Sequence, residues 1–264
     1  MSKATNSTPK PLDQGWRISL ATAGFAIAVG VFLRIYNLDL KGLWLDEIYS
    51  VYPLYSLSSF SSLWADYMAT DSNSPFYEMV LLAWTSIFGY SDLAVRMPNA
   101  ILGILAVVAI FLVAKAALNR SVAISATILL AFSWPAIFYS QEVRSYSLVL
   151  IFTVLVTGLW LRILGHGSAS RERRRSYWAL LVLAPVLSYT HLYGFIFASF
   201  LWIYLIAADL INKDGASARW ASLGLGVTVL AYLPWLTIML RSMSQTGFLK
   251  LPSYEAPGAQ FFID

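Results

Sequence analysis

The sequence predicts an all-α, polytopic helical membrane protein with about seven transmembrane helices. Hydrophobic residues make up 58% of the 264 residues and charged residues only 12%, whereas a soluble domain carries ~25% charged residues. The mean hydropathy is +0.65. Most of the apolar residues fall in runs close to the ~20 residues that a helix needs to cross a bilayer.

Composition also limits the kinds of site that the chain can build. It contains no cysteine, which excludes disulfides and thiolate metal ligands. The two histidines, His166 and His191, are too few for a histidine-rich metal centre. The sequence pI near 9.2 does not indicate a nucleic-acid partner, because the basic run 171–175 is expected to determine membrane topology.

Seven apolar runs are the expected spans. The first is preceded by a polar tail, 1–17, and contains Arg34 near its far end, where a long side chain can extend to the interface. Proline within or near several spans is compatible with kinked membrane helices. The runs are 18–36, 97–114, 122–139, 146–164, 177–190, 192–211 and 221–240.

An eighth apolar run, 76–88, is too short to cross. As a helix it reaches only ~21 Å against a ~30 Å hydrocarbon core, and it contains Glu78. We expect it to lie at the interface within a long outer loop, 38–96. This choice puts 12 of the 18 basic residues on the cytoplasmic side and 10 of the 14 acidic residues outside.

The resulting topology is that of a multi-pass plasma-membrane protein with a cytoplasmic N-terminus. Residues 18–240 form one transmembrane module, and 241–264 begin a later outer loop of what we expect to be a longer protein. Under this topology three polar groups meet at the outer face. They are the pair Asp46 and Glu47, the segment 71–78 with Arg96 further on, and the short loop at 139–146 with its Glu142 and Arg144.

Structural explanations exist for each of these residues. An acidic pair in a loop is usually solvated, and Gln141, Glu142 and Arg144 can cap two helices and pair with one another. Arg96 can anchor its span at the interface. His191, near a helix end, is more often a hydrogen-bonded structural residue than a ligand.

The order and spacing of these segments resemble the membrane glycosyltransferases of GT-C fold, of the protein O-mannosyltransferase and aminoarabinose transferase type. The segments that carry the resemblance span most of the chain. They are Leu45-Asp46-Glu47-Ile48-Tyr49-Ser50, Asp71-Ser72-Asn73-Ser74-Pro75-Phe76-Tyr77, Phe88-Gly89, Arg96-Met97-Pro98, Tyr139-Ser140-Gln141-Glu142-Val143-Arg144-Ser145-Tyr146 and Thr190-His191-Leu192-Tyr193-Gly194.

The resemblance implies transfer of a sugar from a polyprenyl-phosphate donor to an acceptor hydroxyl at the non-cytoplasmic face, with inversion. Asp46 is then the general base, and Glu47 orients it or binds the acceptor. Arg144 and Arg96 are the candidate ligands of the donor phosphate, because a guanidinium binds phosphate bidentately. The supporting residues are Glu142, Gln141, Tyr139, Tyr146, Ser74, Tyr77 and His191.

One departure from the family pattern leaves alternatives open. Family members often have a cation just before the proline, where this chain has Ser74. Either an arginine elsewhere serves, or the donor is held differently, or the protein is a catalytically silent membrane subunit of the same fold. The rival from another class is a transporter or flippase-like protein, but that would place charged groups at mid-membrane. The sequence assigns no cofactor and leaves the sugar, the acceptor and a divalent-metal requirement open.

Overall fold

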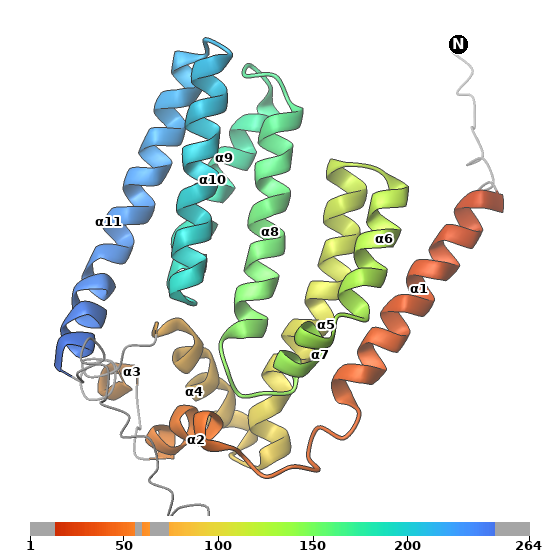
Figure 1. The fold of residues 1–264 in the computed structure, drawn as a ribbon, viewed down its shortest axis with the longest axis vertical. Coiled ribbons are helices and arrows are strands. Elements are labelled where there is room, and N and C mark those ends of the chain that lie inside the picture. The colour runs from red at the N-terminus through yellow and green to blue at the C-terminus, as the bar shows by residue number, and fades with distance from the viewer. Residues whose placement is uncertain (1–13, 56–59, 64–73, 246–264) are drawn as a thin grey trace, which may run out of the picture.

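The computed structural model describes residues 14–55, 60–63 and 74–245, and every element within these ranges is helical (Figure 1). Most of the predicted tail, the segment 71–73 with Asp71, and the chain after residue 245 lie outside the described residues. The helices are α1 (Gln14–Ile35), α2 (Leu45–Val51), η1 (Tyr52–Tyr55), α3 (Phe60–Ser62), α4 (Phe76–Phe88), α5 (Asp92–Ala117), α6 (Arg120–Ala131), α7 (Trp134–Ser140), α8 (Tyr146–Gly165), α9 (Arg171–Ser188), α10 (Leu192–Ile211) and α11 (Gly215–Gln245).

The all-α membrane architecture is confirmed, and all seven predicted spans coincide with helices or a helix pair. Four helices, α5, α8, α10 and α11, are long and apolar enough to cross a membrane, and α6 with α7 makes a fifth if the bent pair is one span. The apolar part of α1 is shorter, and α9 starts with a strongly charged turn. The short run 76–88 forms α4, and α1 ends and α5 begins at the same end of the bundle (Figure 1).

Several helix boundaries follow from local sequence. Ser91, Asn119 and Ser170 each precede a helix and accept a hydrogen bond from a backbone N–H of its first turn. Such caps satisfy donors that have no partner inside the helix. Gly89 ends α4 with a φ of 78°, a conformation that favours glycine.

Helices α6 and α7 are bent by 58° at the break between Ala131 and Trp134. Arg34 explains how the break is tolerated. Its Nη2 donates to Leu130 O at 3.1 Å and its Nη1 to Ala131 O at 3.2 Å, two carbonyls in the last turn of α6. The expectation that Arg34 extends to the interface is therefore wrong. The side chain is fully buried, because the broken span offers it acceptors inside the protein.

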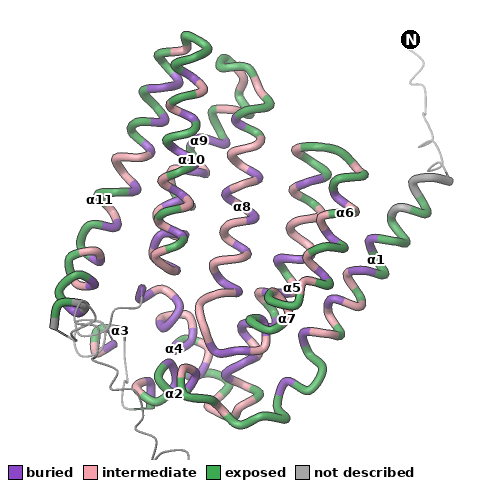
Figure 2. Tube along the Cα trace, in the orientation of Figure 1, coloured by how far each residue is buried: buried purple, intermediate pink, exposed green. Residues whose placement is uncertain are grey.

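The helices pack in two groups that meet where α5 contacts α8. Helices α1 and α6 lie against α5, while α9, α10 and α11 gather beside α8 (Figure 1). Close approach of α5 and α8 depends on Gly158, because a Cβ there would lie 2.7 Å from a methyl of Val113. Buried positions face the helix contacts and exposed positions cover the outside of the bundle (Figure 2).

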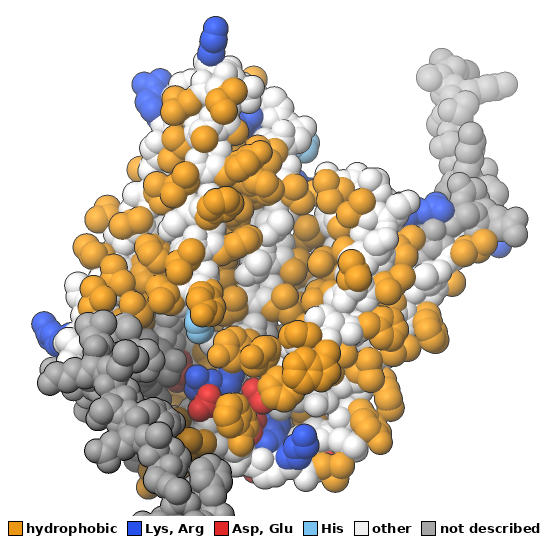
Figure 3. Space-filling view, viewed as in Figure 1, with side chains coloured by type: hydrophobic (Ala, Val, Ile, Leu, Met, Phe, Trp, Pro, Cys, Tyr) orange, Lys and Arg blue, Asp and Glu red, His pale blue; other side chains and the backbone are white. Residues whose placement is uncertain are grey.

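Charged side chains gather at both ends of the bundle, and on the face drawn in Figure 3 the acidic ones lie at the end that carries α2. On the face drawn in Figure 3, acidic and basic side chains cluster there, and the middle of the molecule is covered by hydrophobic side chains. This distribution places the candidate residues of α2, α5 and the α7–α8 loop at one end of the membrane domain.

Candidate active site

The short helix α2 fixes the directions of the two acidic side chains. The chain is extended at Trp44, and the backbone N–H of Trp44 donates to Glu47 Oε2 at 3.2 Å. Two carboxylates in the first turn also suit the positive N-terminal end of a helix. Because adjacent helical residues differ by ~100° in direction, Asp46 and Glu47 point to different surroundings. Glu47 is fully buried, and the side chain of Asp46 is 44% exposed.

Glu47 forms a buried bidentate ion pair with Arg96 of α5. Arg96 Nε donates to Glu47 Oε1 at 2.9 Å, and Nη2 donates to Oε2 at 2.6 Å. The backbone N–H of Val143 donates to the same Oε1 at 3.0 Å. With the bond from Trp44, the carboxylate accepts four hydrogen bonds, so its charge is compensated despite complete burial.

The remaining N–H groups of Arg96 hold the loop between α1 and α2. Nη1 donates to Leu38 O and Lys41 O, and Nη2 donates to Gly42 O at 3.1 Å. All five guanidinium N–H groups of Arg96 are thus used within the protein. The Glu47–Arg96 pair joins α2, the loop before it, α5 and the α7–α8 loop.

Asp46 and Arg144 face each other beside this buried pair. Arg144 Nη2 lies 4.0 Å from Asp46 Oδ2, and the Arg144 side chain is 20% exposed. The contacts of Arg144 Nη1 with Asp46 O and Ser50 Oγ are 3.4 and 3.5 Å long. These long contacts contrast with the short bonds of Arg96 and leave the Arg144 guanidinium accessible to a further ligand.

Glu142 is a third carboxyl at the same place. Burial, with the negative charge of Glu47 as the next contribution, raises the pKa of Glu142 to about 7, although the charge of Arg144 opposes the shift. Part of the Glu142 population therefore carries a proton at neutral pH. Its backbone carbonyl accepts a hydrogen bond from Asn99, which also donates to the Tyr77 hydroxyl at 2.8 Å.

Aromatic side chains continue from Arg144 along the α7–α8 corner. The rings of Tyr139 and Tyr146 are 4.3 Å apart, and those of Tyr146 and His191 are 5.8 Å apart. His191 Nδ1 accepts the backbone N–H of Tyr193 at the start of α10. Burial and the charge of Arg144 lower the pKa of His191, which keeps the ring neutral at pH 7.

Two of the supporting residues have structural contacts. Gln141 Nε2 donates to Leu33 O at 2.9 Å and Tyr36 O at 3.0 Å, so it caps the end of α1. Ser74 is buried just before α4, near Tyr232 of α11, whose hydroxyl has no hydrogen-bond partner among the described residues. The geometry thus gathers Asp46, Glu47, Arg96, Glu142, Arg144, Tyr139, Tyr146 and His191 in one region, which Tyr77 reaches through Asn99.

Two cavities flank α7 at this site. One, of about 600 Å³, is bounded by the end of α1, the α1–α2 loop and α7, and is lined by Glu47, Arg96 and Glu142 among apolar residues. The other, of about 360 Å³, lies between α7 and α8 and includes Tyr139 and Tyr146 in its wall. No group of three acidic or histidine side chains in the described part of the chain is arranged to hold a metal ion.

Sequence reasoning did not single out Asn99 or Ser50. Asn99 is fully buried in α5, directly after the Arg96-Met97-Pro98 segment. A polar residue inside an apolar span is expensive unless it has partners, so its position in the sequence was a usable signal. Ser50 was named only as the last residue of the segment 45–50, with no role of its own.

Comparison with known proteins gives consistent results. Residues 72–238, more than half of the chain, match the family described as dolichyl-phosphate-mannose-protein mannosyltransferase. The fold resembles the Saccharomyces cerevisiae protein O-mannosyltransferase Pmt1-Pmt2 complex bound to the sugar donor, with a TM-score of 0.62 and 16% identity over 89% of this chain. It also resembles an Archaeoglobus fulgidus oligosaccharyltransferase in the apo form, with a TM-score of 0.61 and 16% identity over 95% of this chain.

The chain spans about a third of the length of each of these two structures, 35% and 36%. No curated protein sequence matches it. The two structural similarities, at 16% identity, concern the fold.

Proposed function

The chain belongs to the dolichyl-phosphate-mannose-protein mannosyltransferase family, a family of GT-C-fold glycosyltransferases, and on that premise we propose the reaction that it carries out. The protein transfers a sugar from a polyprenyl-phosphate donor to an acceptor hydroxyl, with inversion at the anomeric carbon. The reaction takes place at the end of the bundle that carries α2. We propose that this end faces the non-cytoplasmic side, because basic residues of the sequence favour the cytoplasmic side and most of them fall at the other end.

The observation that carries this proposal is that three neighbouring carboxyl groups differ in charge pairing, protonation and exposure. Glu47 is neutralised by Arg96, and the raised pKa of Glu142 leaves that group partly protonated. Asp46 alone is substantially exposed, and it faces an accessible arginine, Arg144. A general base next to an anionic phosphate needs this combination, because uncompensated carboxylates would repel the donor.

In the proposed mechanism Asp46 accepts the proton of the acceptor hydroxyl. The hydroxyl oxygen attacks the anomeric carbon from the face opposite the phosphate, and the bond from that carbon to the phosphate oxygen breaks. The electron pair leaves with the polyprenyl phosphate, which gains one negative charge. Arg144 stabilises this charge as it develops, which is the kind of interaction that lowers a barrier.

We assign Glu47 and Arg96 to positioning. In the sequence they were candidates for catalysis and phosphate binding, but every N–H of Arg96 is already donated and both oxygens of Glu47 are occupied. The pair instead fixes the start of α2, and thereby Asp46, against the α7–α8 loop that carries Arg144. Arg144 is then the cation that serves in place of the one missing at Ser74.

The apolar groove between α7 and α8 suits the first isoprenoid units of the donor. Its wall includes Tyr139 and Tyr146, which flank the loop that carries Arg144, together with Leu130 and Leu150. This arrangement would seat the phosphate at Arg144 and the hydrocarbon against the membrane helices.

The test is a donor panel with membranes that contain the complete protein. We expect transfer of labelled sugar from a polyprenyl-phosphate sugar and none from the corresponding nucleotide sugar, with the anomeric configuration of the product inverted. Equal transfer from the nucleotide sugar would contradict the proposed lipid donor. A product with retained anomeric configuration would contradict a single displacement at the anomeric carbon.

A further inference from the structure

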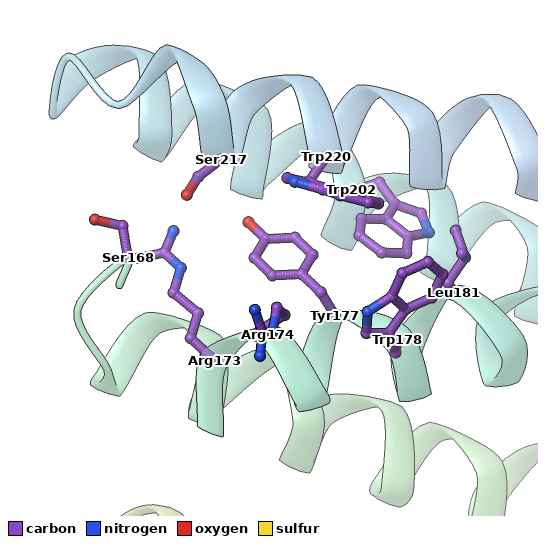
Figure 4. A pocket seen from close by; sticks show the side chains of 9 residues that line it. All are labelled: Ser168, Arg173, Arg174, Tyr177, Trp178, Leu181, Trp202, Ser217 and Trp220. Carbon is purple, nitrogen blue, oxygen red and sulfur yellow. The ribbon is translucent and has the colours of Figure 1, made fainter. Parts of the chain in front are cut away.

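A second polar site lies at the end of the bundle away from α2 (Figure 1), where side chains of α9, α10 and α11 enclose a cavity (Figure 4). It is a cavity of about 100 Å³ whose lining is apolar on one part and polar on the other. One part is aromatic and aliphatic, and the other carries arginine and serine side chains. The lining residues are Ser168, Arg173, Arg174, Tyr177, Trp178, Leu181, Trp202, Ser217 and Trp220.

Arg173 is held in the polar part of this cavity with its Nε–H unused in the part of the chain that the structure describes. Its Nη2 pairs with Asp209, which also accepts a hydrogen bond from the Tyr177 hydroxyl at 2.8 Å. Its Nη1 donates to His166 O at 3.2 Å. The buried Nε has no hydrogen-bond partner among the described residues. A buried donor without an acceptor is unfavourable, so a ligand oxygen would be stabilising here.

The surrounding charge favours an anion. Arg174 is exposed beside the cavity and makes no ion pair with any residue that the structure describes. Between residues 162 and 219 the chain carries seven basic and three acidic side chains. Asp209 is already neutralised by Arg173, and Asp214 accepts the backbone N–H of Ser217 at the start of α11. An incoming anion therefore meets a net positive environment.

The apolar part of the site extends onto the outer surface of the helices. Trp178 and Trp220 stack edge to face at 5.4 Å, and they remain 54% and 47% exposed. Tryptophan side chains at this depth are typical of the membrane interface. The enclosed volume is close to that of one phosphate group, whereas the exposed tryptophans offer a surface on which an acyl chain can lie.

We propose that this cavity binds the headgroup of an anionic phospholipid, with Arg173 Nε and Arg174 on the phosphate and the acyl chain against Trp178 and Trp220. Basic pockets between membrane helices are suited to such headgroups. The site is separate from Asp46 and Arg144, so its occupancy does not depend on the transfer reaction. It would anchor α9, the most charged helix of the bundle, at its membrane surface.

Tryptophan quenching by brominated lipids tests this directly, without an activity assay. The purified full chain in detergent micelles is titrated with dibrominated phosphatidylglycerol and, separately, with dibrominated phosphatidylcholine. We expect quenching at a lower mole fraction of phosphatidylglycerol. The saturable part of the signal should shrink in Trp220→Phe, which separates this site from the other tryptophans of the chain.

Two matched substitutions on α9 give the discriminating comparison. Arg174→Gln should raise the mole fraction of phosphatidylglycerol for half-quenching about fivefold. Arg175→Gln removes the same charge from the next residue, which does not line the cavity, and should change that value less than twofold. Arg173 is left intact because its replacement would leave the buried Asp209 carboxylate without its paired cation.

Three results would overturn the proposal. Phosphatidylcholine as effective as phosphatidylglycerol would show that the headgroup charge is not recognised. Equal effects of Arg174→Gln and Arg175→Gln would show that only the general basic surface matters. Displacement of the brominated lipid by millimolar inorganic phosphate would assign the cavity to a free anion.

Discussion

Replacing Glu47 by glutamine should destabilise the fold strongly, because it removes the only carboxylate paired with Arg96 among the described residues. The substituted amide also presents a donor where the carboxylate accepted N–H groups from Arg96, Val143 and Trp44. Breaking one side of a buried ion pair costs about 3–5 kcal/mol. We expect a loss in that range for Glu47→Gln and for Arg96→Met.

The double variant Glu47→Gln/Arg96→Met tests whether the two residues act as a pair. With both charges gone, no charge is left uncompensated, so the loss should be smaller than the sum of the single losses by about 2–3 kcal/mol. Unfolding in detergent, followed by tryptophan fluorescence during titration with a denaturing detergent, gives the three free energies. Additivity within about 0.5 kcal/mol would refute the coupling.

Asp46→Asn is the matched control for stability. It changes the neighbouring residue on the same helix, but the Asp46 side chain is 44% exposed and its ion pair with Arg144 is 4.0 Å long. We expect a change within about 0.5 kcal/mol. A loss as large as that of Glu47→Gln would show that both acids are structural and would contradict the separate roles assigned to them.

Three further predictions concern other parts of the structure. Because the pKa of Glu142 is raised to about 7 in the fold from its ordinary value near 4.5, folding favours the protonated form; stability should fall as the pH rises between these values. Glu142→Gln should remove that part of the slope, as unfolding midpoints between pH 5 and pH 8 would show. Arg144→Gln should lower transfer by about 10²–10³-fold, with partial recovery in Arg144→Lys, while Arg241→Gln, an exposed arginine on α11, should leave transfer unchanged. Gly103→Ala should cost about 1–3 kcal/mol in detergent unfolding, since its Cβ would overlap a side chain of α7, whereas Gly24→Ala meets nothing within 4 Å and should not destabilise.

Each of these predictions has a contradicting result. If the unfolding midpoints of wild type and Glu142→Gln depend equally on pH, another group is responsible for the pH dependence. Full transfer by Arg144→Gln would leave the phosphate to another cation. Equal stability of Gly103→Ala and Gly24→Ala would mean that α5 and α7 do not approach closely.

The helical framework was predictable because its signal is long and repeated. Apolar runs such as 146–164 and 192–211 coincide with α8 and α10 to within a residue or so. The short run 76–88 was separable from the spans by length and charge alone, and it forms α4. The same physical constraint, a fixed hydrocarbon thickness, acts on every span and makes the prediction robust.

The gathering of polar residues at one end was predictable, but their individual contacts were not. Topology put Asp46, Glu47, Arg96 and Arg144 on one face. The sequence shows that Asp46 and Glu47 are neighbours in the chain. Which of the two side chains is buried and which is exposed depends on how the seven-residue helix α2 is rotated about its axis. That rotation is set by Arg96, 49 positions further along the chain.

Arg34 shows a second limit of sequence reasoning. An arginine near the end of a span usually extends to the interface. Here the break between α6 and α7 exposes the carbonyls of Leu130 and Ala131 to it instead. Pro135 hinted at a kink in that span, but the pairing of a kink with a buried arginine from another helix requires the three-dimensional structure.

The proposed mechanism requires Asp46 to accept a proton in sugar transfer. It is tested most directly by comparing wild type and Asp46→Asn in membranes containing the complete protein, with a saturating polyprenyl-phosphate sugar and matched protein levels. We predict a fall in the transfer rate of about 10²–10⁴-fold, with unchanged folding in the detergent assay. Undiminished transfer by the Asp46→Asn protein would contradict the account.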